Sequence, residues 1–438
     1  MTRYVILGAG AAGMSAAETI RGVDDKGEIV CVTAETAGYY SRPGLAYYLS
    51  KELGEKSLYP FTKKDFQNKQ LILYQNAAVH IDTANQEVFF KDRKRMTYDR
   101  LLIALGARAV RPEIPGNGLE GVVYLDSMEQ TQYMIKKARW AKTAVVIGGG
   151  ITALEMVEGL HARGVHVHFF LRGRTYWGRV LDSIESKIIL ERLIKEGVSV
   201  HFNTELDQIL GKRGKVKAVV TKDGRTIKSS MVGFAIGVRP RIRLAELSGL
   251  EVNRGVMVNE YMETSVPGVF SAGDVAEVYD PEAGKYVIDS LWHIARSQGI
   301  VAGLNMAGQQ QPYIRRSPLN VTRLAGITTT IIGTLGSGEK EEEEYSIVRG
   351  ESETWQQMPD AVVCQNNFEI NRLRLMLGEN RILGALLMGD QSLSQALEEL
   401  VANQVDITPV RDSLVKNRET LGPTVMKFWD QWRQQHAD

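Results

Sequence analysis

Two stretches of this chain follow the same pattern: a short apolar run, a glycine-rich turn and a stretch that favours a helix. The first reads RYVILGAGAAGMSAAETI over residues 3–20, and the second reads TAVVIGGGITALE over residues 143–155. In a strand–turn–helix unit, the first glycine allows a tight turn, the second lets a phosphate approach the backbone, and the third lets the helix lie close to the strand. The duplication predicts an α/β chain with two dinucleotide-binding units.

The first unit carries Gly8, Gly10 and Gly13 in these three positions. A glycine pattern alone is weak, because such turns also occur without a ligand. Here the next apolar run, residues 29–33, ends in Ala34-Glu35, about 20 residues beyond the loop, where a carboxylate can accept hydrogen bonds from both ribose hydroxyls. We therefore expect a nucleotide at this loop; the alternative is that Glu35 is a plain surface carboxylate.

The second unit places Gly148, Gly150 and Ala153 in the corresponding positions. A helix through Leu160 and a strand over residues 165–170 would complete a strand–helix–strand unit. Two nucleotide sites in one chain suggest that the two nucleotides meet, and hydride transfer from nicotinamide to flavin is the chemistry that needs both.

The composition fits a globular protein of more than one domain. Its 438 residues exceed the roughly 100 to 200 of an ordinary domain, so two or three domains are expected. The net charge is +1, with Lys and Arg spread along the chain, which favours small ligands or modest protein partners over nucleic acid or an anionic membrane. The first apolar run begins at Tyr4, so we expect no signal peptide. No run reaches the roughly 20 apolar residues of a membrane span, and we expect a cytoplasmic protein.

Three further segments occur in a characteristic order. They are LLIALG at 101–106, with Arg108 and RPEIPG following; TSVPGVFSAGD at 264–274; and WHIARSQGIVAGLNMAG at 292–308. Together with the two glycine loops, they make the chain resemble the flavoprotein family of pyridine nucleotide-disulfide oxidoreductases. Within it, the similarity is to the branch that contains rubredoxin and ferredoxin reductases and the flavin portion of NAD(P)H nitrite reductases.

The resemblance implies two Rossmann-like, three-layer nucleotide-binding domains, the second inserted in the first, and an α+β C-terminal domain. It implies an FAD-binding domain over 1–112 and 236–312, an NAD(P)H-binding domain over 113–235 and a C-terminal domain over 313–438. In the last, strands are expected at 327–332 and 383–387 and helices at 392–403 and 409–416. The acidic run Glu341–Glu344 is expected to be solvated. Phe428, Trp429 and Trp432 are interpreted as either a packing or a dimer contact.

The resemblance also implies which residues contact each nucleotide. Those expected at FAD come from the first loop, the strand ends and the later signatures: Gly8, Gly10, Ala11, Ala12, Gly13, Glu35, Arg42, Pro43, Val79, Ala104, Gly106, Arg108, Gly273, Asp274, Trp292 and Ala295. Those expected at NAD(P)H surround the second loop: Gly148, Gly150, Ile151, Thr152, Ala153, Glu155, Arg172, Arg174, Ile236 and Gly237.

One element of the resembled family is missing. Its disulfide reductases carry a redox cysteine beside the flavin, but here the segment from Tyr40 reads YSRPGLAYY, with Pro43 in that place. The two cysteines, Cys31 and Cys364, have neither a CxxC nor a metal-ligand spacing, and we expect both to be small buried side chains. Electrons must then leave the flavin for an external acceptor.

The segment Ser41-Arg42-Pro43 resembles that of the electron-transferase branch, in which a cation near flavin N5 pairs with the Glu after the second loop. This implies catalytic roles for Arg42 and Glu155, joined in an ion pair that positions the nicotinamide and holds charge as the flavin becomes anionic. The alternative is that they are two unrelated charges.

The nicotinamide site lacks the carboxylate that NAD-specific sites place at the end of the second strand. Alignment with the resembled family puts Leu171 there, and Arg172 and Arg174 follow. Because a guanidinium suits a 2′-phosphate, we expect NADPH to serve at least as well as NADH. His161, His166 and His168 lack a further ligand at a recognisable spacing, so no metal site is expected.

The leading interpretation is an FAD-dependent NAD(P)H oxidoreductase that passes electrons to a rubredoxin-like or ferredoxin-like protein, a nitrite-reductase-type partner or a small acceptor. The alternatives are an oxidase or diaphorase that reduces oxygen or quinones directly, and an FAD-binding regulatory protein without turnover. The resemblance makes a homodimer the expected state.

Overall fold

The computed structural model describes residues 1–336, 349–352, 354, 362–367 and 371–436, with residues 362–367 described by their backbone alone. The chain divides into two compact units. Unit 1 comprises Met1–Arg172, Asn203–Ile314 and Tyr345–Gly350, and unit 2 comprises Gly173–Phe202, Arg315–Glu344 and Glu351–Asp438.

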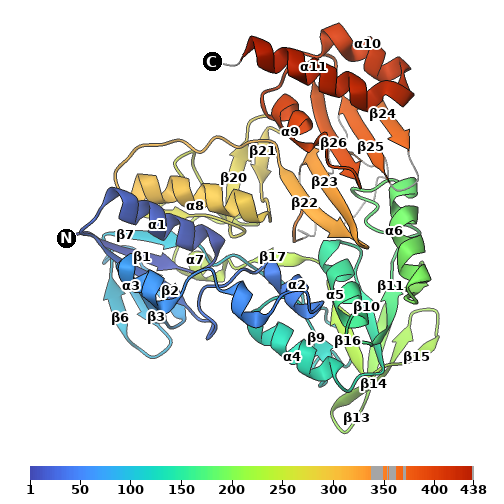
Figure 1. Ribbon diagram of the computed structural model, residues 1–438. Coiled ribbons are helices and arrows are strands. Elements are labelled where there is room, and N and C mark those ends of the chain that lie inside the picture. The colour runs from blue at the N-terminus through green and yellow to red at the C-terminus, as the bar shows by residue number, and fades with distance from the viewer. Residues whose placement is uncertain (337–348, 353, 355–361, 368–370, 437–438) are drawn as a thin grey trace. The chain divides into compact units, whose positions relative to one another are not determined.

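Unit 1 contains a parallel sheet in the order β19-β7-β1-β2-β3, and Figure 1 labels β7, β1, β2 and β3 of it. Its strands are β1 (Arg3–Leu7), β2 (Glu28–Thr33), β3 (Leu71–Gln75), β7 (Arg100–Ile103) and β19 (Val269–Ser271). Because β19 follows the second glycine loop in sequence, the chain leaves this sheet, forms another and then returns to complete the first. The sheet is therefore built from two separated segments.

Both faces of this sheet are covered, because side chains alternate along a strand. Ile6 faces the helices α1 (Ala11–Val23) and α8 (Trp292–Met306), whereas Val5 and Leu7 pack on the opposite side. That side is covered by α7 (Arg243–Leu247) and a sheet of β4 (Ala78–Asp82), β5 (Glu87–Phe90) and β6 (Arg95–Thr97). The result is a three-layer arrangement around β1.

Helices α1 and α8 lie side by side (Figure 1) because glycines remove the side chains between them. A Cβ on Gly299 would lie 2.2 Å from the carbonyl oxygen of Ala12, and one on Gly303 would lie 2.8 Å from that of Ala16. The helix after the first glycine loop is thus fixed by the segment 292–306, far away in sequence.

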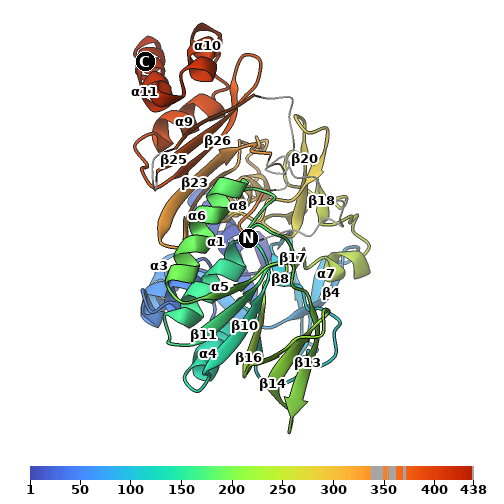
Figure 2. The same cartoon turned by 90° about the vertical axis from the view of Figure 1, so that its right-hand side faces the viewer.

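A second parallel sheet in unit 1 contains β11 (His166–Phe170), β10 (Thr143–Ile147), β16 (Met231–Phe234) and β9 (Val122–Val123), in that order. Figure 2 shows β10, β11 and β16 side by side. Helix α5 (Ile151–His161) follows β10, and α4 (Met128–Ala138) follows β9. Val145, Phe170 and Val232 pack against the antiparallel strands β13 (Leu206–Lys212) and β14 (Lys215–Thr221), which are extended by β15 (Thr226–Lys228).

Short elements connect and complete unit 1. The chain leaves the first sheet through β8 (Ala107–Ala109) and returns through β17 (Val238–Pro240), and these two strands pair antiparallel. Further elements are α2 (Gly44–Leu49), η1 (Glu55–Leu58), α3 (Lys63–Asn68) and a sheet of β18 (Val256–Val258), β20 (Ala276–Asp280) and β21 (Lys285–Val287).

Unit 2 is an antiparallel sheet with helices. The strand order is β22 (Leu319–Leu324), β23 (Ile327–Gly333), β26 (Ile382–Met388), β25 (Arg372–Leu377) and β24 (Val362–Asn367). The other elements are α6 (Ser183–Lys195), β12 (Ser199–His201), α9 (Ser394–Ala402), α10 (Thr408–Lys416), η3 (Arg418–Thr420) and α11 (Leu421–Gln435). Two buried arginines of β25, Arg372 and Arg374, pair with Glu185 at 3.0 and 2.9 Å, so this unit holds α6 through buried charges.

The α/β fold with two parallel nucleotide-type sheets is confirmed, as are the strands near 327–332 and 383–387 and the two helices that follow. The domain boundaries stay a prediction. Phe428, Trp429 and Trp432 pack against the core of unit 2. Cys31 is buried, as expected, whereas the side chain of Cys364 and the run Glu341–Glu344 lie outside the described residues.

None of the helices that the structure describes combines the length and apolar character that a membrane span requires.

Candidate nucleotide-binding sites

In the first glycine loop, Gly8 and Gly13 are closely packed, whereas Gly10 has open space beside it. Gly8 has a φ of +117°, and a Cβ there would lie 2.1 Å from the carbonyl oxygen of Ala104. A Cβ on Gly13 would lie 1.9 Å from the oxygen of Gly8, while one on Gly10 would meet nothing within 4 Å. The loop therefore excludes side chains where strand and helix meet, and it leaves open space at the position through which a pyrophosphate would approach.

The first glycine of the second loop is packed in the same way. Gly148 has a φ of +146°, and a Cβ there would lie 2.1 Å from the carbonyl oxygen of Ala235. A Cβ on Gly149 would meet nothing within 4 Å, and Gly150, the counterpart of Gly10, is the N-cap residue of α5. Ile151 and Ala153 are buried against the sheet, and the predicted residues Ile236 and Gly237 follow directly after Ala235. Both loops thus lie at the C-terminal ends of their central strands.

The helices after both loops begin without a capping side chain. Gly10 and Gly150 provide none, whereas the Ser127 side chain caps α4 and Asp182 caps α6. The first turns of α1 and α5 therefore keep backbone N–H groups for another acceptor. Together with the positive end of the helix dipole, these groups suit a phosphate, so the residues present fit a dinucleotide at each loop.

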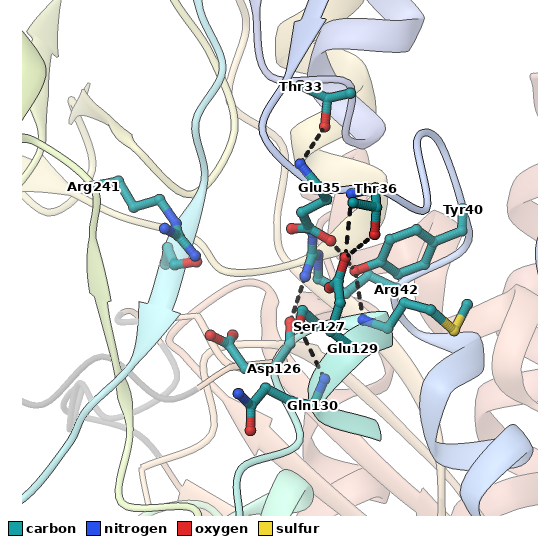
Figure 3. A network of polar contacts seen from close by, with 12 residues as sticks. Thr33, Glu35, Thr36, Tyr40, Arg42, Asp126, Ser127, Glu129, Gln130 and Arg241 are labelled. Carbon is teal, nitrogen blue, oxygen red and sulfur yellow. Dashed lines mark hydrogen bonds and ion pairs between the residues drawn. The ribbon is translucent and has the colours of Figure 1, made fainter. Parts of the chain in front are cut away.

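Glu35 lies just beyond β2 and is held by two neighbours (Figure 3). The Tyr40 hydroxyl donates a hydrogen bond of 2.5 Å to one carboxylate oxygen, and the Arg42 guanidinium pairs with the other at 2.7 Å. Arg42 also stacks on the Tyr40 ring at 5.1 Å. Glu35 is therefore held in one orientation by two side chains, and its contact with a ribose stays a prediction.

The Glu35 cluster continues into the segment that leads to α4. Arg42 donates to the backbone oxygen of Asp126, and the backbone N–H of Met128 donates to the Tyr40 hydroxyl at 3.1 Å (Figure 3). The Thr36 hydroxyl donates to Glu129 at 2.9 Å. The loop after β2 is thus joined to the start of α4, which belongs to the second nucleotide-binding half of the unit.

Helix α2, which Arg42 and Pro43 precede, packs directly on α5. A Cβ on Gly159 would lie 2.5 Å from Leu49, and the Arg163 guanidinium donates to the carbonyl oxygens of Leu49 and Tyr48 at 2.6 and 2.9 Å. Because Arg163 satisfies the last carbonyl groups of α2, the helix after Arg42 is fixed to the helix that carries Glu155.

The predicted ion pair between Arg42 and Glu155 is not formed in the described part of the chain, because Arg42 pairs with Glu35 instead. Glu155 lies in the first turns of α5 and is partly buried. Burial raises the pKa of its carboxyl to about 8, Arg349 lowers that pKa, and Glu158 raises it. Glu155 is therefore mostly protonated at neutral pH. The catalytic roles of both residues stay predictions.

Three residues of this region, Tyr40, Asp126 and Arg349, were not identified from the sequence. Tyr40 orients Glu35, and Asp126 accepts from Arg42 through its backbone and pairs with Arg349 through its carboxylate. Burial raises the pKa of Asp126, but the charge and hydrogen bond of Arg349 outweigh it, and the pKa lies below its usual value. Burial raises the pKa of Asp274, which Arg349 and Arg42 oppose. The sequence offered a signal only for Tyr40, in its place beside the Ser41-Arg42-Pro43 segment.

The end of β11 has no carboxylate. Leu171 is 1% exposed, and its carbonyl oxygen accepts from the N–H of Thr204 at 2.9 Å. Arg172, the next residue, is exposed in unit 1, and Arg174 is exposed in unit 2. This strand end therefore presents exposed Arg172 where the first site has Glu35.

The remaining predicted FAD contacts differ in exposure. Ala104 and Ala295 are buried, Gly106 and Gly273 have positive φ angles, and the backbone N–H of Gly273 donates to the Gln298 side chain at 2.8 Å. The more accessible ones are Pro43, Val79, Arg108 and Trp292. Trp292, at the start of α8, is 46% exposed, and Arg296 stacks on its ring at 4.8 Å. No three His, Cys, Asp or Glu side chains of the described segments gather as metal ligands.

Comparison with known proteins agrees with this geometry. The family model described as pyridine nucleotide-disulphide oxidoreductase matches residues 2–299. An NADH oxidase of Methanocaldococcus jannaschii is 33% identical over 71% of this chain and 71% of its own length. A rubredoxin-NAD(+) reductase of Ectopseudomonas oleovorans is 31% identical over 70% of this chain and 80% of its own. The crystal structure of a covalent putidaredoxin reductase–putidaredoxin complex superposes with a TM-score of 0.84 at 21% identity, covering 97% of this chain and 98% of that one.

The fold and the paired loops define a two-nucleotide reductase. The chain belongs to the pyridine nucleotide-disulphide oxidoreductase family. It is an FAD-dependent NAD(P)H oxidoreductase, which moves a hydride from NAD(P)H to FAD and passes the electrons to an external acceptor.

Proposed function

We propose that the external acceptor is a small redox protein of the rubredoxin or ferredoxin kind. The observation that carries this proposal is Pro43, exposed at the start of α2 in the position where disulfide reductases of the resembled family have a redox cysteine. Cys31, the cysteine whose side chain the structure describes, is buried in β2, and burial raises the pKa of its thiol to about 12. A thiolate relay has no support at this site. The relative from Ectopseudomonas oleovorans, named for rubredoxin, fits the proposal.

Each predicted site residue has a definite task in this reaction. The loop Gly8–Gly13 and the first turn of α1 bind the FAD pyrophosphate, and Glu35 accepts from its ribose while Tyr40 and Arg42 hold it in place. The loop at Gly148 binds NAD(P)H in the same way. Glu155 keeps its proton at neutral pH, so it adds no negative charge beside the nicotinamide. When bound, FAD would supply the chemistry that accepts a hydride and releases electrons one at a time.

We also propose that NADPH is used at least as well as NADH. Leu171 replaces the carboxylate that would select a free 2′-hydroxyl, and the exposed Arg172 and Arg174 can each offer a guanidinium to a 2′-phosphate. Steady-state kinetics with both nucleotides test this. A kcat/KM for NADPH equal to or above that for NADH is expected, and a strong preference for NADH would contradict it.

A second candidate function is direct reduction of oxygen, favoured by the relative named NADH oxidase. Stopped-flow reoxidation of the reduced enzyme separates the two functions. We expect rubredoxin or ferredoxin to reoxidise the enzyme faster than air-saturated buffer does. Reoxidation by air at the rate of turnover, with no acceleration by either protein, would establish the oxidase instead.

The assembly and location of the chain are proposed separately. We propose a homodimer, following the resemblance of residues 313–438 to the C-terminal domain of the family, and a cytoplasmic location. Light scattering of the purified protein tests the first, with a mass of twice 48.7 kDa expected. Fractionation of the native cell tests the second.

A further inference from the structure

Arg349 and Gly350 are fixed between elements of the two nucleotide sites, although they come from the last quarter of the chain. The Arg349 guanidinium pairs with the carboxylate of Asp126 and donates to the carbonyl oxygen of Leu125 at 3.3 Å. The backbone N–H of Gly350 donates to the carbonyl oxygen of Ser290 at 2.9 Å. Leu125 and Asp126 lead into α4, and Ser290 lies just before α8, so Arg349 is attached to both halves of unit 1.

This arginine is well placed to act by charge. Its side chain is only 20% exposed, and a cation held away from water exerts a stronger field than one on the surface. Among the charged groups that lower the pKa of Glu155 or of Asp274, Arg349 has the largest effect in both cases. Arg42 acts on Asp274 as well, but it is not among the charges that act on Glu155. Arg349 and Arg42 also share Asp126, which accepts from Arg42 through its backbone oxygen and pairs with Arg349 through its carboxylate. Arg349 therefore lies beside a residue that is predicted at the flavin.

Hydride transfer creates a charge that such a cation would stabilise. NAD(P)H gives up a hydride, which is two electrons and one proton, and becomes NAD(P)⁺. Uptake of this hydride by bound FAD would leave the reduced flavin with one additional negative charge. A fixed positive charge beside the flavin favours the reduced form without reorganising during the reaction.

We propose that Arg349 supplies the positive charge that offsets the reduced flavin, a role that the sequence assigned to Arg42. The inference rests on the proposed function. Arg42 is placed differently, because its guanidinium pairs with Glu35 on the ribose side of the FAD site. Asp126, which pairs with Arg349, partly cancels this charge. The two partners of one ion pair should therefore affect the flavin in opposite directions.

The test is the reduction potential of the bound flavin in the holoenzyme, measured against a reference dye without NAD(P)H. Arg349→Met should shift the equilibrium at least tenfold toward oxidised flavin, which is about 30 mV for a two-electron couple. Arg349→Lys should keep the potential close to that of the parent. Asp126→Asn should shift the potential in the opposite direction, toward reduced flavin, because Arg349 would keep its positive charge and no longer be paired with a carboxylate.

Arg95→Met is the control, since Arg95 forms an exposed pair with Glu87 and should leave the potential unchanged. A merely structural ion pair predicts similar losses for Arg349→Met and Asp126→Asn, and shifts in the same direction would overturn the proposal. A loss in Arg349→Lys as large as in Arg349→Met would also overturn it. Failure of the proposed function has a separate readout, because the flavin of the parent enzyme would then not be reduced by NAD(P)H.

Discussion

The two glycine loops of unit 1 have nearly the same backbone but different surroundings. Gly8 and Gly148 both have positive φ angles, and a Cβ on either would lie 2.1 Å from the carbonyl oxygen of an alanine. Beyond the first loop, Glu35 is bonded to Tyr40 and Arg42. Beyond the second, the corresponding strand ends in buried Leu171, followed by exposed Arg172.

This difference fits a cofactor that stays bound at the first site and a substrate that is exchanged at the second. The loop itself binds a pyrophosphate in both cases. A carboxylate that is already oriented recognises the ribose without further ordering, which favours tight binding. Beyond the second loop no carboxylate is oriented in this way, and this suits a nucleotide that must leave after each turnover. The comparison can be tested one site at a time.

The largest effect is expected from Gly8→Ala, because the new Cβ meets the oxygen of Ala104 and the φ of +117° is strained for any other residue. We expect a stability loss of about 3 kcal/mol or more and protein that is purified without FAD. Gly148→Ala, whose Cβ would meet the oxygen of Ala235 at the same distance, should also lose stability, but it should retain FAD and lose reduction by NAD(P)H. Thermal unfolding, the visible spectrum and anaerobic reduction measure these outcomes.

Gly10→Ala is the matched control for this comparison, because its Cβ would meet no protein atom within 4 Å. The apoprotein should keep its melting temperature, while FAD binding weakens. If Gly148→Ala lost FAD and Gly8→Ala kept it, the assignment of the two sites would be reversed.

Glu35→Gln should have the next largest effect, confined to the first site. Loss of a charged acceptor costs about 1.5 to 3 kcal/mol, so FAD affinity should fall by roughly tenfold to a hundredfold. The KM for NAD(P)H should change little. Tyr40→Phe, which leaves the Glu35 carboxylate in place, should lower the FAD affinity by less. Titration of the apoprotein with FAD measures both, and equal losses would show that Glu35 does not contact the nucleotide.

Arg172→Ala should change binding at the NAD(P)H site alone, and there it should weaken the binding of NADPH alone. If Arg172 bonds the 2′-phosphate, its loss should raise the KM for NADPH by about tenfold, while the KM for NADH stays the same. Arg174→Ala tests the other arginine in the same assay. Arg213→Ala, at an exposed turn, is the control. Equal changes for NADH and NADPH would refute a role in 2′-phosphate recognition.

Glu155→Gln should produce the smallest change at neutral pH, because the carboxyl is already mostly protonated there. In the parent enzyme, kcat/KM for NAD(P)H should bend near pH 8, where Glu155 loses its proton beside Arg349 and Glu158. The variant should lack this bend. A bend that persists unchanged in Glu155→Gln would assign it to another group.

The same titration has a consequence for stability, whose sign follows from proton uptake. The pKa of Glu155 is higher in the folded than in the unfolded chain, so the folded state binds more protons between the ordinary glutamate range and about pH 8. Stability should therefore fall as the pH rises through this window. Glu155→Gln should unfold at a higher temperature than the parent above pH 8, and this difference should disappear at acidic pH.

The loops and the fold could be predicted from the sequence because a strand–turn–helix unit is a local pattern. Gly8 and Gly148 take their φ angles from their own turns. The contacts around them depend on segments far apart in the chain. Gly299 meets Ala12, and Arg349 meets Asp126, across sequence separations that no spacing rule covers.

Arg42 illustrates the limit of prediction from resemblance. The sequence paired it with Glu155, whereas the structure pairs it with Glu35 and stacks it on Tyr40. Both candidate carboxylates follow a glycine loop, so the choice depends on where the residues before α2 place the side chain. That placement is set by tertiary contacts such as the Arg163 bonds to α2, which the sequence does not specify.

The central claim is that a hydride passes from NAD(P)H to FAD without a thiol relay. Anaerobic titration of the oxidised enzyme with NADPH, followed by the visible absorbance of the flavin, tests it most directly. Without a relay, the flavin is the only two-electron acceptor, so one equivalent of NADPH per flavin should bleach it completely. A requirement for a second equivalent, abolished when the thiols are first alkylated, would show that a cysteine pair shares the electrons and would contradict the account.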